Sequence, residues 1–409
     1  MQEIYLDNAA TTKPHPHVIE AMNQCMEQEY GNASSLHRMG LTAEHRLQEG
    51  RSSMAGLIHA QKQEIIFTSG GTESDYTAIY GTAIARKREG QQIITTSIEH
   101  PAVLETCKRL EQQGFQVIYL KVDPAGRIDL TELEQQLSDR TILVSVMHVN
   151  NELGTIQPLS EIGALIQSKS KASFHTDAVQ SFGKLPLDVR SMGIDLLSAS
   201  SHKLYGPKGV GLLYRRERHR LEATLVGGGQ EGGLRSGTEN VPGIAGFAKA
   251  VILAQERMDR DLHWVQECRS YLWKGIQTEI PDAVCHGPQD LKQVSPYLLN
   301  VSFPGTKGEV LLHMLEQNGI YVSTGSACSS RKRGQSHVLT AIGLPKALIE
   351  GAIRFSFHNA HTMEELDQVI HHVKKSVLEM RKIMFTRSLT GRKGENSDRG
   401  SSGMDRPMR

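Results

Sequence analysis

Between residues 64 and 215, the hydrophobic pattern switches repeatedly between two kinds of segment. Short runs rich in β-branched residues alternate there with longer stretches of helical periodicity, such as residues 159–169. This alternation predicts an α/β domain with a largely parallel sheet flanked by helices. Catalytic groups are then expected beyond the carboxyl ends of the strands. The expected strands are residues 64–68, 92–97, 116–122, 141–148, 172–176, 194–199 and 210–214.

A second, smaller α+β domain is expected in the C-terminal part of the chain. A helical pattern runs from Pro242 to about Glu279 and is expected to connect the two domains. Strands are expected at residues 298–303 and 353–357, with a helix near residues 309–317. Strands and helices that follow the strand–helix alternation of residues 64–215 indicate a separate packed unit.

The last predicted helix begins with a capping box, in which Thr362 is followed three residues later by Glu365. Apolar residues at helical spacing predict ordinary core packing for one face of this helix. From Thr386 onward, periodicity is absent and six basic residues outnumber three acidic ones, which predicts disorder. The expected units are an N-terminal segment at 1–15, a large domain at 16–258, a small domain at 259–385 with a mobile cysteine loop at 323–336, and a tail at 386–409.

Composition narrows the class of protein. Of the 409 residues, 38% are hydrophobic and 22% charged, which is typical of a globular protein. The net charge of +1 argues against nucleic acid as a direct partner. We expect no membrane association, because apolar runs fall short of the roughly 20 residues that span a bilayer. The N-terminus has no signal-like features, so a cytoplasmic location is expected. Five scattered cysteines without a C-x-x-C pair argue against a disulfide framework or a zinc site.

Lys203 is the first candidate for chemistry. It follows the expected strand at 194–199 and precedes a turn that contains Gly206 and Pro207. A lysine at the carboxyl end of a strand can form a Schiff base with a carbonyl cofactor. A lysine in a loop is more commonly a solvated charge, but Ser200 and His202 beside it could bind a phosphate.

Asp177 closes the expected strand at 172–176. A carboxylate there can pair with a pyridinium nitrogen and keep it protonated, which makes the ring a better electron sink. Gln180 can reach the same ligand if a helical turn begins here. The alternative role for Asp177 is a helix N-cap.

Three further strand ends carry candidate ligands. The segment 68–74, which contains Gly71 and Thr72, opens a predicted helix and could bind phosphate through its backbone N–H groups. His100 follows another strand and could stack on a flat ring and exchange protons, although such a histidine is more often structural or exposed. Asn151 is the second of two consecutive amides at a third strand end.

Cys328 lies among small residues and is followed by a basic segment that is unsuited to a core. The neighbouring Arg331, Lys332 and Arg333 favour a thiolate over a thiol with a reference pKa of about 8.5. The alternative is an exposed cysteine without a function.

Together these segments closely resemble the NifS/IscS-type cysteine desulfurases of the class V aminotransferase-like group, which are fold-type I enzymes that use pyridoxal 5'-phosphate (PLP). The resemblance runs from residue 5 to about Phe357. Its motifs occur in family order at family-like spacing: Asp177-x-x-Gln180, Ser200-x-His202-Lys203-x-Tyr205-Gly206-Pro207-Lys208-Gly209, Arg235-Ser236-Gly237-Thr238 and Ser326-Ala327-Cys328. The long segment after Cys328 is similar to the class with an extended cysteine loop.

The resemblance implies a role for each matching residue. Lys203 would carry the cofactor, Asp177 would pair with its ring nitrogen, and Cys328 would take the sulfur. The remaining implied roles are Gln180 at the ring hydroxyl, Asn151 near the ring hydroxyl and the substrate carboxylate, Gly71, Thr72, Ser200 and His202 at the phosphate, Thr238 at the phosphate of a second subunit, His100 in stacking and proton transfer, and Arg354 at the substrate carboxylate. No resident metal is expected, apart from transient ligation of an iron–sulfur cluster by Cys328.

The implied reaction converts L-cysteine to L-alanine and leaves a persulfide on Cys328. The implied partners are a second copy of the chain and a sulfur acceptor, either an iron–sulfur scaffold or a tRNA-thiolating enzyme. Two departures from the family are Tyr76, where asparagine is frequent, and the basic segment 331–335. The rival hypotheses are another PLP reaction, such as a transaminase or a selenocysteine lyase, and a non-catalytic scaffold for sulfur carriers.

Overall fold

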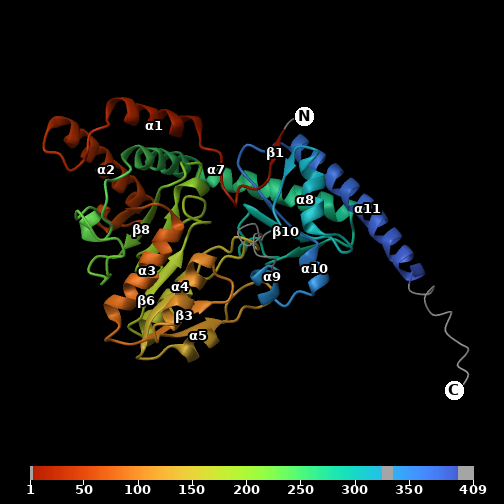
Figure 1. Cartoon of the computed structure of the whole chain (residues 1–409), viewed down its shortest axis with the longest axis horizontal. Helices are drawn as coiled ribbons and strands as arrows, with labels where there is room; N and C mark the ends of the chain where they lie inside the picture. The colour runs from red at the N-terminus through yellow and green to blue at the C-terminus, as the bar shows by residue number, and fades with distance from the viewer. Residues whose placement is uncertain (1–2, 325–334, 395–409) are drawn as a thin grey trace, which may run out of the picture.

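The computed structural model describes residues 3–324 and 335–394, and side chains as far as residue 383. The molecule is elongated, with a large domain and a small domain side by side (Figure 1). The long helix α7 (Val241–Glu279) runs along both and connects them. It begins where Asn240 accepts a hydrogen bond from the Gly243 N–H, which is a standard N-cap.

The large domain is built on a seven-stranded sheet of order β2-β8-β7-β6-β5-β3-β4. The four pairs from β7 to β4 are parallel, whereas β8 is antiparallel to both of its neighbours. The predicted largely parallel sheet is therefore confirmed. The strands are β2 (Ile65–Thr68), β3 (Gln92–Thr96), β4 (Gln116–Leu120), β5 (Thr141–Ser145), β6 (Ser173–Asp177), β7 (Leu196–Ser200) and β8 (Gly211–Arg215).

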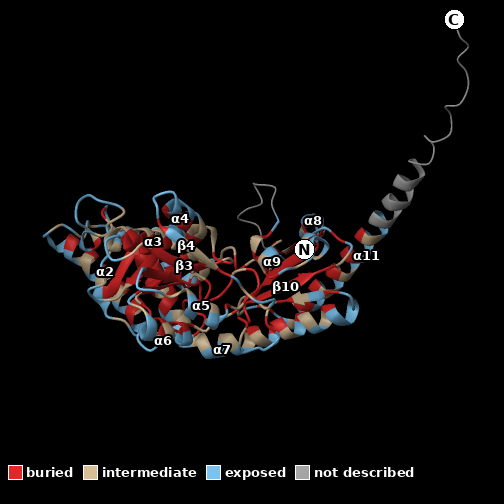
Figure 2. Ribbon diagram, turned by 90° about the horizontal axis from the view of Figure 1, so that it is seen from below, coloured by how far each residue is buried: buried red, intermediate tan, exposed pale blue. Residues whose placement is uncertain are grey.

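The central strands are fully buried because helices cover both faces of the sheet. Figure 2 shows this core as a continuous red layer beneath exposed helix surfaces. Burial on both faces explains why these strands show no strict alternation of polar and apolar residues. The helices of this domain are α1 (Pro16–Gln28), α2 (Arg38–Leu57), α3 (Gly71–Arg86), α4 (Pro101–Glu111), α5 (Leu130–Gln136) and α6 (Leu159–Lys169), with short 3₁₀ turns η1 (Lys62–Glu64), η2 (Ser201–Lys203) and η3 (Glu231–Gly233).

The small domain has an antiparallel sheet of order β12-β10-β9. Its core is apolar and includes Ile353 on β12 and Val373 on α11, both fully buried. The apolar face predicted for the last helix therefore packs in this core. The elements are β9 (Val284–His286), β10 (Leu298–Ser302), α8 (Gly308–Glu316), β11 (Ile320–Tyr321), α9 (His337–Ala341), α10 (Lys346–Glu350), β12 (Ala352–Ser356) and α11 (Met363–Gly394).

The N-terminal segment joins the two domains. Strand β1 (Ile4–Tyr5) pairs with β11 of the small domain, and the Ser356 N–H donates to the Leu6 carbonyl at 2.7 Å. A few residues later, the Thr12 N–H donates to the carbonyl of His202 in the large domain at 2.8 Å. One end of the segment is thus hydrogen-bonded to the small domain, and the other end to the large domain.

Two observations concern the ends of the predicted units. Helix α11 (Met363–Gly394) continues past Thr386, where the tail is predicted to begin, and residues 395–409 lie outside the described residues. Within the described ranges, every helix is either too short or too polar to cross a bilayer.

A buried glycine of α6 gives a test of this packing. A Cβ added at Gly163 would lie 2.0 Å from the Met192 carbonyl oxygen, so Gly163→Ala should destabilise the protein by about 1–3 kcal/mol. The matched control is Gly56→Ala on α2, where an added Cβ meets nothing within 4 Å. This substitution should stabilise the helix by about 0.5–1 kcal/mol. Chemical denaturation of both variants measures the difference; equal effects would contradict the packing.

Candidate active site

A cavity of about 320 Å³ lies beyond the carboxyl ends of the parallel strands. Residues from both domains line it, as expected for a ligand site in an open α/β sheet. The structure brings nearly all predicted site residues to this cavity. Those that line it are Gly71, Thr72, His100, Asn151, Asp177, Gln180, Ser200, His202, Lys203 and Arg354.

Lys203 stands at the end of η2, immediately after β7. Its Nζ donates to the carbonyl oxygens of Ala9 and Ala10, at 2.5 and 2.7 Å. Tyr205 follows with a left-handed φ of 59°, so the chain turns away sharply after the lysine. The amino group is thus held at the cavity wall by hydrogen bonds to the N-terminal segment.

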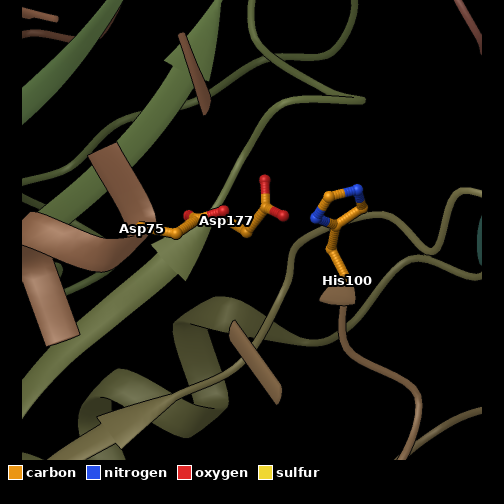
Figure 3. A group of neighbouring side chains, drawn as sticks. All are labelled: Asp75, His100 and Asp177. Carbon is orange, nitrogen blue, oxygen red and sulfur yellow. The ribbon is translucent and has the colours of Figure 1, made fainter. Parts of the chain in front are cut away.

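Asp177 ends β6 and is buried beside the ring of His100 (Figure 3). Its Oδ1 accepts from the Val179 N–H at 2.9 Å, so the side chain caps the following turn and also lines the cavity. Burial raises the pKa of this carboxyl, while the nearby His100 and Lys203 lower it. Asp177 can therefore cap the turn and also contact a bound ring, which were the two alternatives that the sequence left open.

His100 is the N-cap of α4, where its Nδ1 accepts from the Ala102 N–H at 3.2 Å. This bond leaves the other ring nitrogen, Nε2, as the proton-carrying atom of the neutral ring. Burial lowers the pKa of His100, and the Asp177 carboxylate opposes that shift. His100 therefore serves helix α4 and the cavity at the same time.

The turn between β2 and α3 forms one end of the cavity. Gly70 has a φ of 157°, which side chains rarely permit, and Gly71 is the first residue of α3. A Cβ at Gly71 would lie 2.7 Å from Val179 Cγ2, so only glycine leaves this cradle open. Exposed N–H groups at a helix N-terminus bind anions. Ser200 ends β7 close to this turn.

His202 lies next to the same end of the cavity. Its Nδ1 is 3.1 Å from the Thr11 hydroxyl, and burial together with Lys203 lowers its pKa to about 4. The ring is therefore neutral at pH 7 and can donate a hydrogen bond without adding charge.

Arg354 on β12 brings the small domain into the site. Its Nη1 donates to the Asn151 carbonyl at 2.9 Å and its Nη2 to Asp7 Oδ1 at 2.8 Å. The buried Nε has no hydrogen-bond partner in the described part of the chain, and the side chain lines the cavity. The preceding amide, Asn150, is structural, because its Oδ1 accepts from the N–H groups of Glu152 and Leu153.

The remaining predicted residues are Gln180, Thr238 and Cys328. Gln180 donates through Nε2 to the Ala9 carbonyl at 3.0 Å, so it supports the N-terminal segment as well as lining the cavity. Thr238 is exposed on a loop and does not line the cavity of its own chain. Cys328 lies outside the described residues.

Sequence reasoning missed Asp75, Glu152 and His337, which also line the cavity. Asp75 lies four residues after Gly71 on α3, and this spacing places both on one helix face, a signal that was available. Glu152 follows Asn151 directly. His337 begins α9, and its local sequence carries no comparable signal.

Comparison with known proteins gives a consistent result. Residues 4–369 match the family model Aminotransferase class-V. A cysteine desulfurase IscS of Clostridium botulinum is 44% identical over 382 residues, which are 93% of this chain and 96% of that protein. One of Methanosarcina thermophila is 45% identical over 378 residues, covering 92% of this chain and 93% of that protein.

Solved structures agree. A NifS-like protein superposes with a TM-score of 0.86 at 39% identity, covering 91% of this chain and 99% of that one. The apo cysteine desulfurase of Thermococcus onnurineus gives a TM-score of 0.83 at 27% identity, covering 92% and 95%. SspA in complex with cysteine gives 0.76 at 35% identity, covering 88% and 100%.

The carboxyl group of Glu99, next to His100, predicts a pH-dependent stability. It is fully buried and accepts from Thr96 and from the Met147 N–H, and burial raises its pKa to about 8. The folded state therefore holds a proton that the unfolded state loses above about pH 4.5, so stability falls as the pH rises toward 8.

We expect Glu99→Gln to gain stability over the wild type by up to about 1.4 kcal/mol for each pH unit between about 4.5 and 8. Urea denaturation across this pH range measures the slope. Glu105→Gln, at an exposed position of α4, should show none. A difference that stays constant between about pH 4.5 and 8 would show that Glu99 is ionised in the folded protein.

Proposed function

The chain belongs to the aminotransferase class-V family and is a cysteine desulfurase, and from this premise we propose which residues carry the reaction. Lys203, Asp177 and His100 would act at a PLP cofactor, Arg354 would bind the carboxylate of L-cysteine, and Cys328 would receive the sulfur. The observation that supports this best is the convergence of a strand-end lysine, a buried carboxylate and an anion-binding helix terminus on one cavity.

The residues present fit PLP. The open cradle at Gly71, with Thr72 at the start of α3, would hold the phosphate together with Ser200 and the neutral His202. At the opposite end, the Asp177 carboxylate would pair with the ring nitrogen. Bound PLP supplies an electron sink that stabilises negative charge at the substrate α-carbon.

Proton movement would fall to Lys203 and His100. Lys203 Nζ donates to two carbonyl oxygens, which orient the amino group at the cavity wall. His100 has a fixed Nδ1 acceptor, so any proton that it moves must be carried on Nε2. Gln180 and Asn151 would hold the ring hydroxyl, with Asn151 also near the substrate carboxylate.

The sulfur step would use Cys328. Its thiolate attacks the sulfur of L-cysteine, an S–S bond forms, and the C–S bond breaks with its electron pair left on the substrate carbon. Protonation of that carbon gives L-alanine. The persulfide on Cys328 would pass to an acceptor protein by thiol exchange, either an iron–sulfur scaffold or a tRNA-thiolating enzyme.

The proposal extends to assembly as a homodimer through the position of Thr238. Its exposed loop does not reach the cavity of its own chain, which supports a homodimer in which Thr238 contacts the phosphate bound by the second subunit. We propose a cytoplasmic location for this dimer. The small domain would present Cys328 to the acceptor.

The test is L-alanine release from L-cysteine by PLP-loaded protein with reductant present. We expect the wild type to form alanine and Cys328→Ala to lose at least 100-fold in rate, because the attacking thiolate is missing. Cys285→Ala, a partly buried cysteine of the small domain, is the matched control and should keep its activity. Lys203→Ala should abolish both the absorbance of the bound cofactor and the reaction.

Equal alanine release by the wild type and Cys328→Ala would rule out a persulfide on this residue and indicate a simple PLP lyase. Arg354→Gln separates binding from chemistry, since it should raise KM for L-cysteine at least tenfold. An unchanged KM would contradict the assigned carboxylate contact.

A further inference from the structure

Asp75 is a buried carboxyl group that the proposed reaction leaves without a role. It lies on α3 with 1% of its surface exposed and lines the cavity next to Asp177 (Figure 3). One carboxyl oxygen of Asp75, one of Asp177 and one ring nitrogen of His100 all lie within 4.8 Å of one another. Two acidic groups thus share one buried corner of the site.

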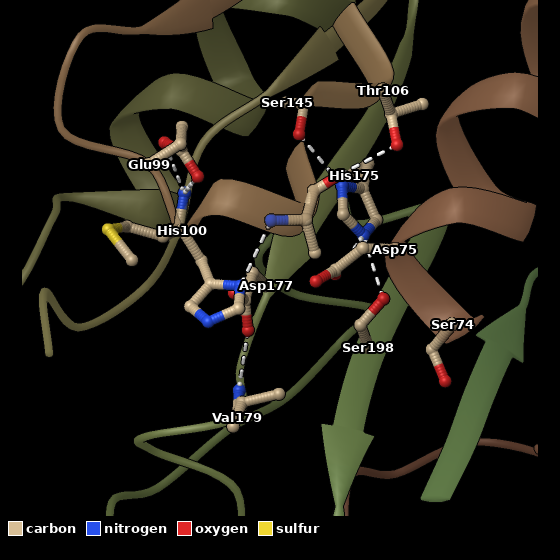
Figure 4. A network of polar contacts seen from close by, with 12 residues as sticks. Ser74, Asp75, Glu99, His100, Thr106, Ser145, His175, Asp177, Val179 and Ser198 are labelled. Atoms are coloured by element: carbon tan, nitrogen blue, oxygen red, sulfur yellow. Dashed lines mark hydrogen bonds and ion pairs between the residues drawn. The ribbon is translucent and has the colours of Figure 1, made fainter. Parts of the chain in front are cut away.

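The surroundings of Asp75 offer it no cation of its own among the described residues. The nearest basic group is His175, whose Nε2 is 3.7 Å from Asp75 Oδ1. That ring lies between the hydroxyls of Ser145 at 2.8 Å and Ser198 at 3.0 Å (Figure 4). Burial lowers the pKa of His175 to about 3, so it is neutral. Asp75 Oδ1 also has no hydrogen-bond partner in the described structure.

The two carboxyl groups differ in their neighbours. His100 and Lys203 face Asp177 and favour its ionised form. Burial raises the pKa of Asp75 most, the neighbouring Asp177 raises it further, and a hydrogen bond with Ser198 lowers it. When two carboxyls are this close in a low dielectric, the first ionisation opposes the second. Asp177 Oδ1 accepts a hydrogen bond from the Val179 N–H, whereas Asp75 Oδ1 has no hydrogen-bond partner among the described residues, so the proton stays on Asp75.

We propose that Asp75 is a positioning residue that remains a neutral carboxylic acid behind Asp177, so that a single negative charge faces the ring nitrogen of the cofactor. The proposal rests on the proposed function only for the role of Asp177 at the ring nitrogen. Its consequence is electrostatic: the layer beneath Asp177, formed by Asp75, His175 and two serines, is neutral throughout. A second carboxylate in this layer would change the proton affinity of the groups that are bound next to Asp177.

The first measurement needs neither cofactor nor activity. Infrared spectra of full-length protein labelled with ¹³C-aspartate, with and without PLP, should show the carbonyl band of a protonated aspartic acid at pH 7. The label excludes the buried Glu99 as its source. Asp75→Asn should remove the band. Its absence from the wild type, or its persistence in Asp75→Asn, would overturn the proposal.

The second measurement follows the absorbance of the Lys203-bound cofactor against pH. Asparagine copies the shape of a neutral acid, so Asp75→Asn should keep the midpoint within about 0.3 pH units and PLP affinity within about twofold. Asp75→Ala should weaken PLP binding at least fivefold, because Asp177 loses its neighbour. If Asp75 were ionised, Asp75→Asn would shift the midpoint by about one unit, a tenfold change in proton affinity.

The two measurements separate the proposals. A wild type that binds no PLP at Lys203 contradicts the proposed function, while the infrared band still decides the state of Asp75. A shifted midpoint in Asp75→Asn with normal alanine formation overturns the neutral acid and leaves the proposed function intact. Thermal melting of each variant shows whether a loss of affinity reflects unfolding.

Discussion

The site depends on the backbone of residues 6–12, which lies between the two domains. Its carbonyl oxygens accept from Ser356 of the small domain and from Lys203 and Gln180 of the large domain. Backbone groups in a buried position must be satisfied, so this segment cannot shift without breaking bonds to both domains at once. The distance between Lys203 and Arg354 is therefore fixed by a segment that precedes both by about 190 residues or more.

Side-chain bonds reinforce the same junction. Asp7 accepts from Arg354, the Ala9 N–H donates to the Ser356 hydroxyl, and the Thr12 hydroxyl donates to the His202 carbonyl. Each bond joins a residue near the N-terminus to a residue with a proposed role in binding, or to its neighbour. The motif at residues 5–12 is best understood as the connection between the cofactor end and the substrate end of the cavity.

Burial sets the electrostatics of this cavity. It raises the pKa of Asp75, Asp177 and Glu99 and lowers the pKa of His100 and His202, so few groups carry charge without a close partner. Perturbed acids and bases gathered in one cleft are typical of catalytic sites. These groups come from segments at or just after the carboxyl ends of strands, which all lie at the same end of the sheet. Residues from four separate segments of the chain therefore meet there.

The sequence by itself determined the strand and helix order, the largely parallel sheet and most of the cavity-lining residues, because apolar periodicity and strand-end polar groups are local properties of the chain. The tertiary structure alone decided that β8 runs antiparallel, that Asp177 and His100 are caps as well as cavity residues, and that Asp75 lies against Asp177. Strand direction, burial and the approach of two carboxyl groups from α3 and β6 depend on contacts between distant segments. Local patterns do not contain that information, and so Asp75 was missed although its helical spacing from Gly71 was visible.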